Sequence, residues 1–441
     1  MNRLDRLAGL IAAARAAGAD ASDALLVDSA SLSISRRLGK LEQLERAESI
    51  DIGLRVFVGG SQAIIASSDA DPAGFARLAE QAVAMARVVP ADALAGLLPP
   101  RPIPSADLDL LDPTEPDAEA LIARAALAEE AALAVSGVTN SEGAEAGWSR
   151  TRVALVTSAG FAGEWARSGH SISASALAGH GTAMERDYDY SSAVHLSDLE
   201  DAAAIGRRAG EQAVARLNPR RAATARLPVV YAPRVAGSLL GHLSAAINGA
   251  TVARGTSFLK DSMGSRVLAA GLHLTDDPTR RRGLRSKPFD GEGTPCAPLR
   301  LVEDGVLRSW IMDGRSARQL GLASTGHASR GTSGPPNPSA TNLWLHPGTA
   351  SPAELMADIA EGLYVTELIG MGVNGVTGDY SRGAAGFMIR HGELAEPVSE
   401  ITIAGRLQEM FLHLTPASDL VFKRGTDAPT VRVDGMTLAG A

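Results

Sequence analysis

Apolar and polar positions at the start of the chain change their spacing twice. Residues 1–20 place apolar side chains on one helical stripe, which predicts an amphipathic helix. Residues 23–69 alternate apolar and polar positions between glycine turn signals, which predicts an antiparallel meander. Helical spacing returns over residues 71–89. We therefore expect a helix, strand and helix unit over residues 1–98.

A second unit with the same order of elements follows a proline-rich stretch. Prolines recur throughout residues 90–116 and exclude regular structure for most of it, so we assign residues 99–116 as a connector. The pattern then predicts a helix over 118–134, alternating strands, and a helix over 199–217. These elements form the predicted second α+β unit, residues 117–222.

The rest of the chain, residues 223–441, reads as a larger β-dominated domain. A short strand at 228–231 leads into a helix, and glycine-bounded β segments follow, with hairpins around 304–305 and 391–392. The predicted fold class is α+β, with two helix/antiparallel-strand/helix units followed by this larger domain.

The charge balance argues against a nucleic-acid partner. Lys and Arg total 42 against 50 Asp and Glu, a net charge of −8. The densest basic cluster, residues 279–287, is short and ends beside Asp290. Phosphate binding needs a concentrated positive face, so we predict no contact with nucleic acid.

The single cysteine and the charged first helix predict a cytoplasmic protein. Cys296 cannot form an intramolecular disulfide or a paired-cysteine zinc site, and it has no neighbouring histidine to activate it. Charged residues interrupt the first helix, which excludes a signal-peptide core, and no apolar run reaches membrane-spanning length.

The first helix of the C-terminal domain carries one histidine beside its buried stripe. Val235, Leu239, Leu243 and Ile247 recur at fourfold spacing, and His242 lies next to them. A zinc-protease helix needs two imidazoles and a carboxylate, and neither a second ligand nor an acid lies nearby. We interpret His242 as a packed, hydrogen-bonded histidine, with a metal ligand as the alternative.

Two glycine-rich patterns lie near the end of the chain. Residues 369–375 satisfy G-x-G-x-x-G, but a dinucleotide site needs a helix there and the following residues are β-like, so we assign the glycines to tight turns. Asp379, Ser381 and Arg382 lie among further glycines. They form either a recognition loop or a tight loop shaped by an internal bridge between Asp379 and Arg382.

Four segments together resemble the TldD/PmbA family, and in particular its PmbA (TldE) branch. The resemblance spans essentially the whole chain. Its segments are "GSLLGHLSAAINGA" (237–250), "STGHAS" (324–329), "YVTELIGMGVNGVTGDYSRGAAGF" (364–387) and "PVSEITIAG" (397–405).

The resemblance implies a cytosolic zinc metalloprotease of two subunits. In it, the TldD-like subunit carries His-Glu-x-x-x-His and a further Cys ligand, and the PmbA-like subunit pairs with it. Laid on this chain, the motif covers residues 241–246. Both ligand places are lost, as Gly241 and Ala246, and His242 occupies the place of the glutamate.

We therefore expect a PmbA/TldE-like subunit that acts on unfolded or extended peptides, has no catalytic residue or metal of its own, and is inactive without a TldD-like zinc subunit. In isolation it could form a homodimer. The candidate peptide- or partner-binding residues are Asp379, Tyr380, Ser381, Arg382 and Gly383.

Two alternatives remain open. The chain could be a stand-alone hydrolase, with a site around residues 379–382 or a metal held by distant histidines such as His327 and His391. It could also be a non-enzymatic regulatory protein, in line with the family's older label as a modulator of gyrase.

Overall fold

The computed structural model describes residues 2–440 and places the first half of the chain in one curved antiparallel sheet of six strands. The order across the sheet is β3-β2-β1-β4-β5-β6. The strands are β1 (Ala21–Arg37), β2 (Lys40–Val58), β3 (Ser61–Ser67), β4 (Val138–Thr157), β5 (Ala162–Ala178) and β6 (Glu185–Ala193).

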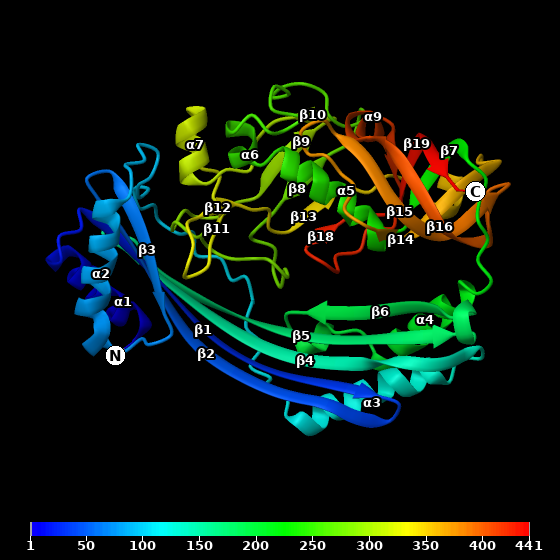
Figure 1. The fold of residues 1–441 in the computed structure, drawn as a ribbon, viewed down its shortest axis with the longest axis horizontal. Coiled ribbons are helices and arrows are strands. Elements are labelled where there is room, and N and C mark those ends of the chain that lie inside the picture. Colours follow the sequence, from blue (N-terminus) through cyan, green and yellow to red (C-terminus); the bar gives the residue numbers. More distant parts are fainter. Residues whose placement is uncertain (1, 441) are drawn as a thin grey trace.

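Helices cover the outer face of this sheet, two at each end (Figure 1). Helices α1 (Arg3–Ala16) and α2 (Phe75–Val88) pack over one end, and α3 (Ala118–Leu133) and α4 (Ala202–Ala215) over the other. Side-chain caps fix three of their starts: Asn2 accepts from the Asp5 amide, Asp117 from the Ala120 amide and Asp201 from the Ala204 amide.

The two predicted N-terminal units are halves of the same sheet. β1 pairs with β2 on one side and with β4 on the other, so that the second unit continues the sheet of the first. The sequence patterns predicted the elements of each unit but not this pairing.

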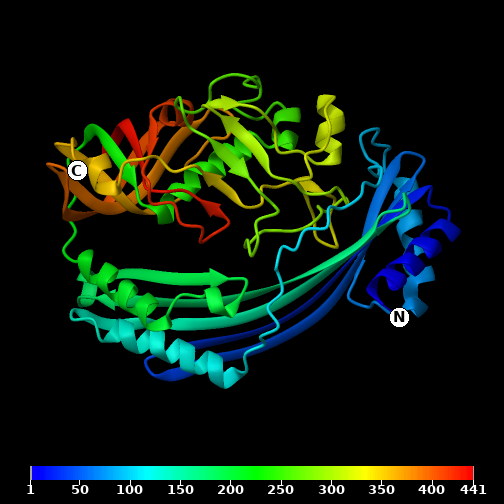
Figure 2. The ribbon, with the colours of Figure 1, turned by 180° about the vertical axis from the view of Figure 1, so that it is seen from behind.

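Both faces of β1 are buried near its start, because the C-terminal domain lies over the concave face of the sheet (Figures 1 and 2). Ala24 and Leu26 pack with the outer helices, whereas the alternate residue Leu25 packs with Phe289 of the C-terminal domain. The concave face is therefore the contact surface between the two halves of the molecule.

The C-terminal domain is built around a ring of strands. The order is β16-β15-β14-β7-β19-β17, and an additional pairing of β16 with β19 closes the ring. A second sheet has the order β10-β9-β8-β13-β18, and β11 pairs with β12. The predicted α+β class with a β-rich C-terminal domain is confirmed. The strands are β7 (Ala225–Tyr231), β8 (Leu274–Asp276), β9 (Leu299–Glu303), β10 (Val306–Leu307), β11 (Ala328–Ser329), β12 (Asn337–Pro338), β13 (Leu343–Leu345), β14 (Glu361–Ile369), β15 (Asp379–Arg390), β16 (Glu393–Arg406), β17 (Leu414–Pro416), β18 (Thr426–Asp427) and β19 (Val431–Ala439).

Helices lie among these strands, and the longest of them, α5, lies in the largest hydrophobic core of the described residues. They are α5 (Pro233–Ala246), α6 (Gly249–Ala253), α7 (Gly314–Leu320), α8 (Pro352–Met356) and α9 (Leu407–Leu412). None of the helices within residues 2–440 combines the length and apolar character needed to cross a bilayer.

The proline-rich segment over residues 90–116 has no helix or strand, as its composition predicts. Backbone hydrogen bonds hold it to both halves: the Ser168 amide donates to Leu110 O and the Arg282 amide to Leu108 O. Arg318 also donates to the carbonyl of Leu97. The connector is thus part of the packed structure.

Candidate functional site

Helix α5 begins with Pro233 in its first turn, where proline's missing N–H costs nothing, and buries Leu239, Leu240 and Leu243. The predicted stripe is largely confirmed, although Val235 is only partly buried and Ile247 lies just beyond the helix end. The helix that resembles a metal helix is thus anchored in the core.

The side chains along residues 241–246 do not fit a zinc site. Gly241 is exposed, with no atom within 4 Å of where a Cβ would lie, and Ala246 is buried at 3% exposure. Neither offers a ligand atom, and His242 supplies one imidazole where zinc needs several donors. Within residues 2–440, no group of three or more His, Cys, Asp or Glu side chains is arranged to hold a metal.

His242 is packed, as we expected, but it does not form the hydrogen bond that we also expected. Its ring meets that of Tyr380 edge to face, with centroids 6.0 Å apart, because β15 lays this tyrosine against α5. Its Nε2 is buried and, among the described residues, has no hydrogen-bond partner. Burial, with a smaller effect of the Arg382 charge, lowers the pKa of His242, which favours a neutral imidazole.

The segment 379–383 is the start of a central strand, not a loop. Asp379 to Gly383 pair with residues 402–406 of β16, so alternate side chains point to opposite faces. Tyr380 is buried at 2% exposure, whereas Asp379 and Ser381 are exposed. The expected loop was wrong because the glycines serve close strand packing: a Cβ on Gly386 would collide with the backbone of Tyr364.

The internal bridge between Asp379 and Arg382 is also absent, because residues three apart in a strand face opposite ways. Asp379 accepts from Thr377 Oγ1 at 2.5 Å and lies 3.9 Å from Arg406 Nε. Arg382 Nε donates to the carbonyl of Ile369 at 3.3 Å. Arg382 thereby links β15 to the end of β14, where the turn between the two strands begins.

That turn, between β14 and β15, contains the G-x-G-x-x-G pattern and no helix. Asn374 Oδ1 accepts from the amides of Val376 and Thr377, which closes the turn. Three apolar side chains project from this turn and from the last residue of β14, and we call them the β14–β15 tip. They are Ile369, Met371 and Val376, with exposures of 58%, 89% and 57%.

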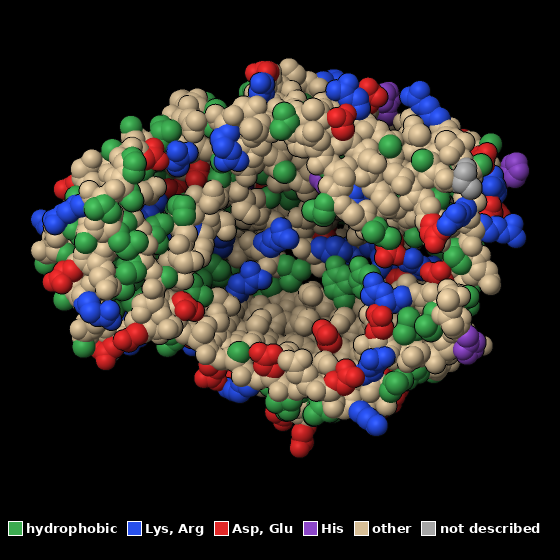
Figure 3. All heavy atoms as spheres, viewed as in Figure 1, with side chains coloured by type: hydrophobic (Ala, Val, Ile, Leu, Met, Phe, Trp, Pro, Cys, Tyr) green, Lys and Arg blue, Asp and Glu red, His purple; other side chains and the backbone are tan. Residues whose placement is uncertain are grey.

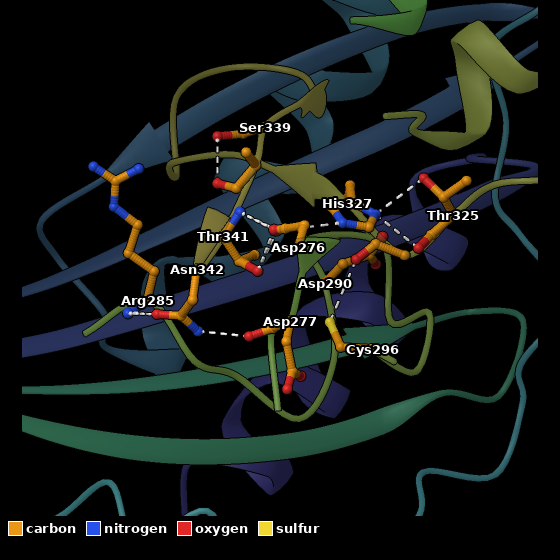
Figure 4. A network of polar contacts seen from close by, with 12 residues as sticks. Asp276, Asp277, Arg285, Asp290, Cys296, Thr325, His327, Ser339, Thr341 and Asn342 are labelled. Atoms are coloured by element: carbon orange, nitrogen blue, oxygen red, sulfur yellow. Dashed lines mark hydrogen bonds and ion pairs between the residues drawn. The ribbon is translucent and has the colours of Figure 1, made fainter. Parts of the chain in front are cut away.

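The alternative residues do not come together. His327 is fully buried, with Nδ1 2.8 Å from Thr325 O and Nε2 3.6 Å from Asp276 Oδ1 (Figure 4). His391 lies exposed in the turn between β15 and β16. Burial raises the pKa of the Cys296 thiol to about 12, which leaves it unreactive.

One feature that sequence reasoning missed is a cleft of about 370 Å³ between the sheet and the C-terminal domain. Its cationic residues Arg167, Arg285, Lys287 and Arg330 come from segments far apart in the chain. Only the basic run at 279–287 marked part of it in the sequence. A larger space of about 680 Å³ lies between β6 and the edge of the C-terminal domain, and ion pairs line it.

Comparison with known proteins covers nearly the whole chain. Family models match residues 22–86 (PmbA/TldA metallopeptidase domain 1), 111–217 (PmbA/TldA metallopeptidase central domain) and 224–440 (PmbA/TldA metallopeptidase C-terminal domain). The metalloprotease PmbA of Escherichia coli O157:H7 is 34% identical over 426 residues, which are 96% of this chain and 92% of the relative.

Two solved structures share the fold. TldE from Thermococcus kodakarensis superposes with a TM-score of 0.88 at 20% identity, covering 99% of this chain and 100% of that one. A protein from Bacteroides thetaiotaomicron described as a putative modulator of DNA gyrase gives a TM-score of 0.91 at 24% identity, covering 99% and 98%. Given the matches to all three family models and to PmbA over 96% of its length, the chain belongs to the PmbA/TldE family of metallopeptidases.

Proposed function

We propose that this chain is the non-catalytic subunit of a two-subunit zinc metalloprotease and that a TldD-like partner holds the zinc. One observation carries the proposal: the helix at the place of the metal helix presents Gly241, His242 and Ala246, which cannot replace two ligands and a general base. The imidazole of His242, whose Nε2 has no hydrogen-bond partner among the described residues, packs against the ring of Tyr380.

The proposed partner surface is the β14–β15 tip. It lies beside α5, because Arg382 bonds to Ile369 and Tyr380 packs on His242. Exposed apolar side chains are costly in water and suit the buried centre of an interface. The candidate residues Asp379, Ser381 and Arg382 would then border the contact with the zinc subunit.

The substrate class we propose is an unfolded or extended peptide in the cytosol. β-rich clefts suit such substrates, because backbone groups pair with a peptide of varied sequence. Membrane and nucleic-acid partners do not enter the proposal, since the net charge is −8 and no helix of residues 2–440 spans a bilayer.

The test is a zinc and activity measurement on the chain alone and on the reconstituted pair. We expect no stoichiometric zinc and no cleavage of an unfolded peptide by the chain alone, and both in the pair. Near-unit zinc in the isolated chain, lost on His242→Ala but kept on His391→Ala, would contradict the proposal. Zinc-dependent turnover by the chain alone would support a stand-alone hydrolase, and an inactive pair would favour a regulatory protein.

A further inference from the structure

The cleft between the sheet and the C-terminal domain is lined by both apolar and cationic side chains. The apolar side chains come chiefly from the sheet, with Leu25 and Val27 on β1 and Trp165 on β5, and Phe289 adds to them. In the hollow between the two halves, Lys and Arg side chains gather (Figure 3). A ligand in the cleft would meet an apolar surface and positive charge together.

The positive charge of the cleft is not neutralised from within. Among the described residues, four cationic side chains line it and Asp290 is the only acidic one. Arg330 is already paired with Asp23, at 2.6 Å. Asp290 is buried at 2% exposure and accepts hydrogen bonds from the amides of Glu292, Thr294 and Ala328.

Arg167, Arg285 and Lys287 therefore form no ion pair, although the charge of Lys287 acts on the buried Asp290. Among residues 2–440, no carboxylate oxygen lies within 4.0 Å of a side-chain nitrogen of Arg167, Arg285 or Lys287. Burial, and then the neighbouring charge of Arg285, lower the pKa of the Arg167 guanidinium. Like charges held this close repel each other, and an anion between them would relieve that repulsion.

These three cations keep hydrogen-bond donors free. Arg167 donates to the carbonyl of Leu284, Arg285 Nη1 to Thr426 Oγ1 at 3.3 Å, and Lys287 Nζ to the carbonyl of Ala328 at 3.1 Å. A guanidinium has five N–H donors and an ammonium three, so each keeps donors for a ligand. Charge-assisted bonds of this kind suit a carboxylate.

We propose that this cleft binds a carboxylate group of an extended peptide, with an adjoining apolar side chain against Trp165 and Phe289. The preference for an anion beside an apolar group rests on the cleft alone, and the choice of a peptide rests on the proposed function. The carboxylate can be the free C-terminus or an internal acidic side chain.

The test measures binding to the full-length chain without a partner. The probe is an N-terminally acetylated decapeptide of Ala, Ser and Gly ending in Leu-Phe with a free carboxylate, and its binding is followed by isothermal titration calorimetry. Two companion peptides carry a C-terminal amide, one without any acid and one with a single Asp beside Leu. We expect the acid-free amide to bind about tenfold more weakly than the free acid, because a charge-assisted contact is lost. Retention of binding by the Asp peptide would show that a side-chain carboxylate serves as well as the C-terminus, and loss would show that the cleft requires the C-terminal carboxylate.

The variants Arg285→Gln and Lys287→Gln should each weaken binding of the free-acid peptide severalfold and make it less sensitive to salt. Arg254→Gln, an exposed residue outside the cleft, removes the same charge and serves as the control. Equal binding of the acid and both amides, or equal effects of all three variants, would overturn the proposal. The zinc measurement above uses the reconstituted pair, so that failure here leaves the proposed function standing.

Discussion

Arg330 Nη1 lies 2.6 Å from Asp23 Oδ1 and joins the C-terminal domain to the centre of the N-terminal sheet. Asp23 Oδ2 also accepts from Arg55 Nε at 2.8 Å, so one buried carboxylate holds two buried guanidiniums. The loop after Arg330 closes over the same place, because a Cβ on Gly53 would collide with the backbone of Thr332. This contact fixes one end of the cleft.

Replacing Asp23 with Ala should destabilise the protein strongly. It would leave Arg55 and Arg330 buried without a counter-charge, and breaking a buried pair in this way costs about 3–5 kcal/mol. Urea unfolding gives the free energy. Glu48→Ala, which breaks the exposed pair with Arg46, is the control and should cost about 0–1 kcal/mol. Similar losses in the two variants would show that the buried triad is not a stabilising link.

Low pH should weaken the ion pairs that Asp23 forms with Arg330 and Arg55. Although burial opposes ionisation, the guanidiniums of Arg330 and Arg55 hold the pKa of Asp23 below its usual 3.8. The unfolded state therefore takes up a proton first, and the stability from this group is present above pH 3.8 and lost as pH falls through its lower folded pKa. Unfolding free energies between pH 6 and pH 3 should fall by less in Asp23→Asn than in the native chain. An equal fall would contradict this assignment.

Glu292 should have the opposite effect on stability, making the protein less stable as pH rises. Burial, and then the charge of Asp290, raise its pKa from 4.5 to about 7. The folded state holds this proton longer than the unfolded state, so its contribution falls as pH rises from 4.5 to about 7 and is constant above. The loss is on the order of 3 kcal/mol.

The variant Glu292→Gln keeps an acceptor for the Gly314 amide and cannot ionise. We measure the free energy of unfolding of this variant and of the native chain at pH 5 and at pH 8. The stability of the variant relative to the native chain should be greater at pH 8 than at pH 5. Glu48→Gln, at an exposed position, is the control. A constant difference between Glu292→Gln and the native chain would count against the raised pKa.

Local sequence patterns predicted the structural features that depend on residues close together in the chain. The period of apolar positions placed α5 and its buried Leu239 and Leu243, and the prolines placed the connector. The long-range pairing of β1 with β4 leaves no local signal, since each strand alternates in the same way with any partner. Likewise Arg167 and Lys287 meet in one cleft only because the domains pack together. The strand at 379–383 was mistaken for a loop because its glycines serve packing between strands.

Arg382→Lys should weaken pairing with the zinc subunit, or peptide cleavage by the pair, severalfold, and should leave the melting temperature nearly unchanged. The planar guanidinium can bond to Ile369 O and still offer a fork to a partner carboxylate, which an ammonium does not reproduce. Arg207→Lys, on the exposed side of α4, is the control. Unaltered pairing and cleavage would reduce Arg382 to a structural role, and a large fall in melting temperature would make it a folding residue.

The β14–β15 tip provides the most direct test of where the partner binds. Met371 is the most exposed large apolar residue of the described chain, at 89%. In the isolated chain Met371→Glu should change stability little, since surface substitutions usually stay within about 0.5 kcal/mol. In the pair the same carboxylate would be buried without a counter-charge, so we expect the dissociation constant to rise about tenfold or more. Sedimentation of mixtures gives that constant. If the isolated chain forms a homodimer through the same tip, Met371→Glu should weaken that homodimer too.

Leu322→Glu, 51% exposed beyond α7, is the matched control and should pair normally. Full pairing by Met371→Glu would place the partner on another surface, because no close apolar interface accepts a buried, unpaired carboxylate at its centre without loss of affinity.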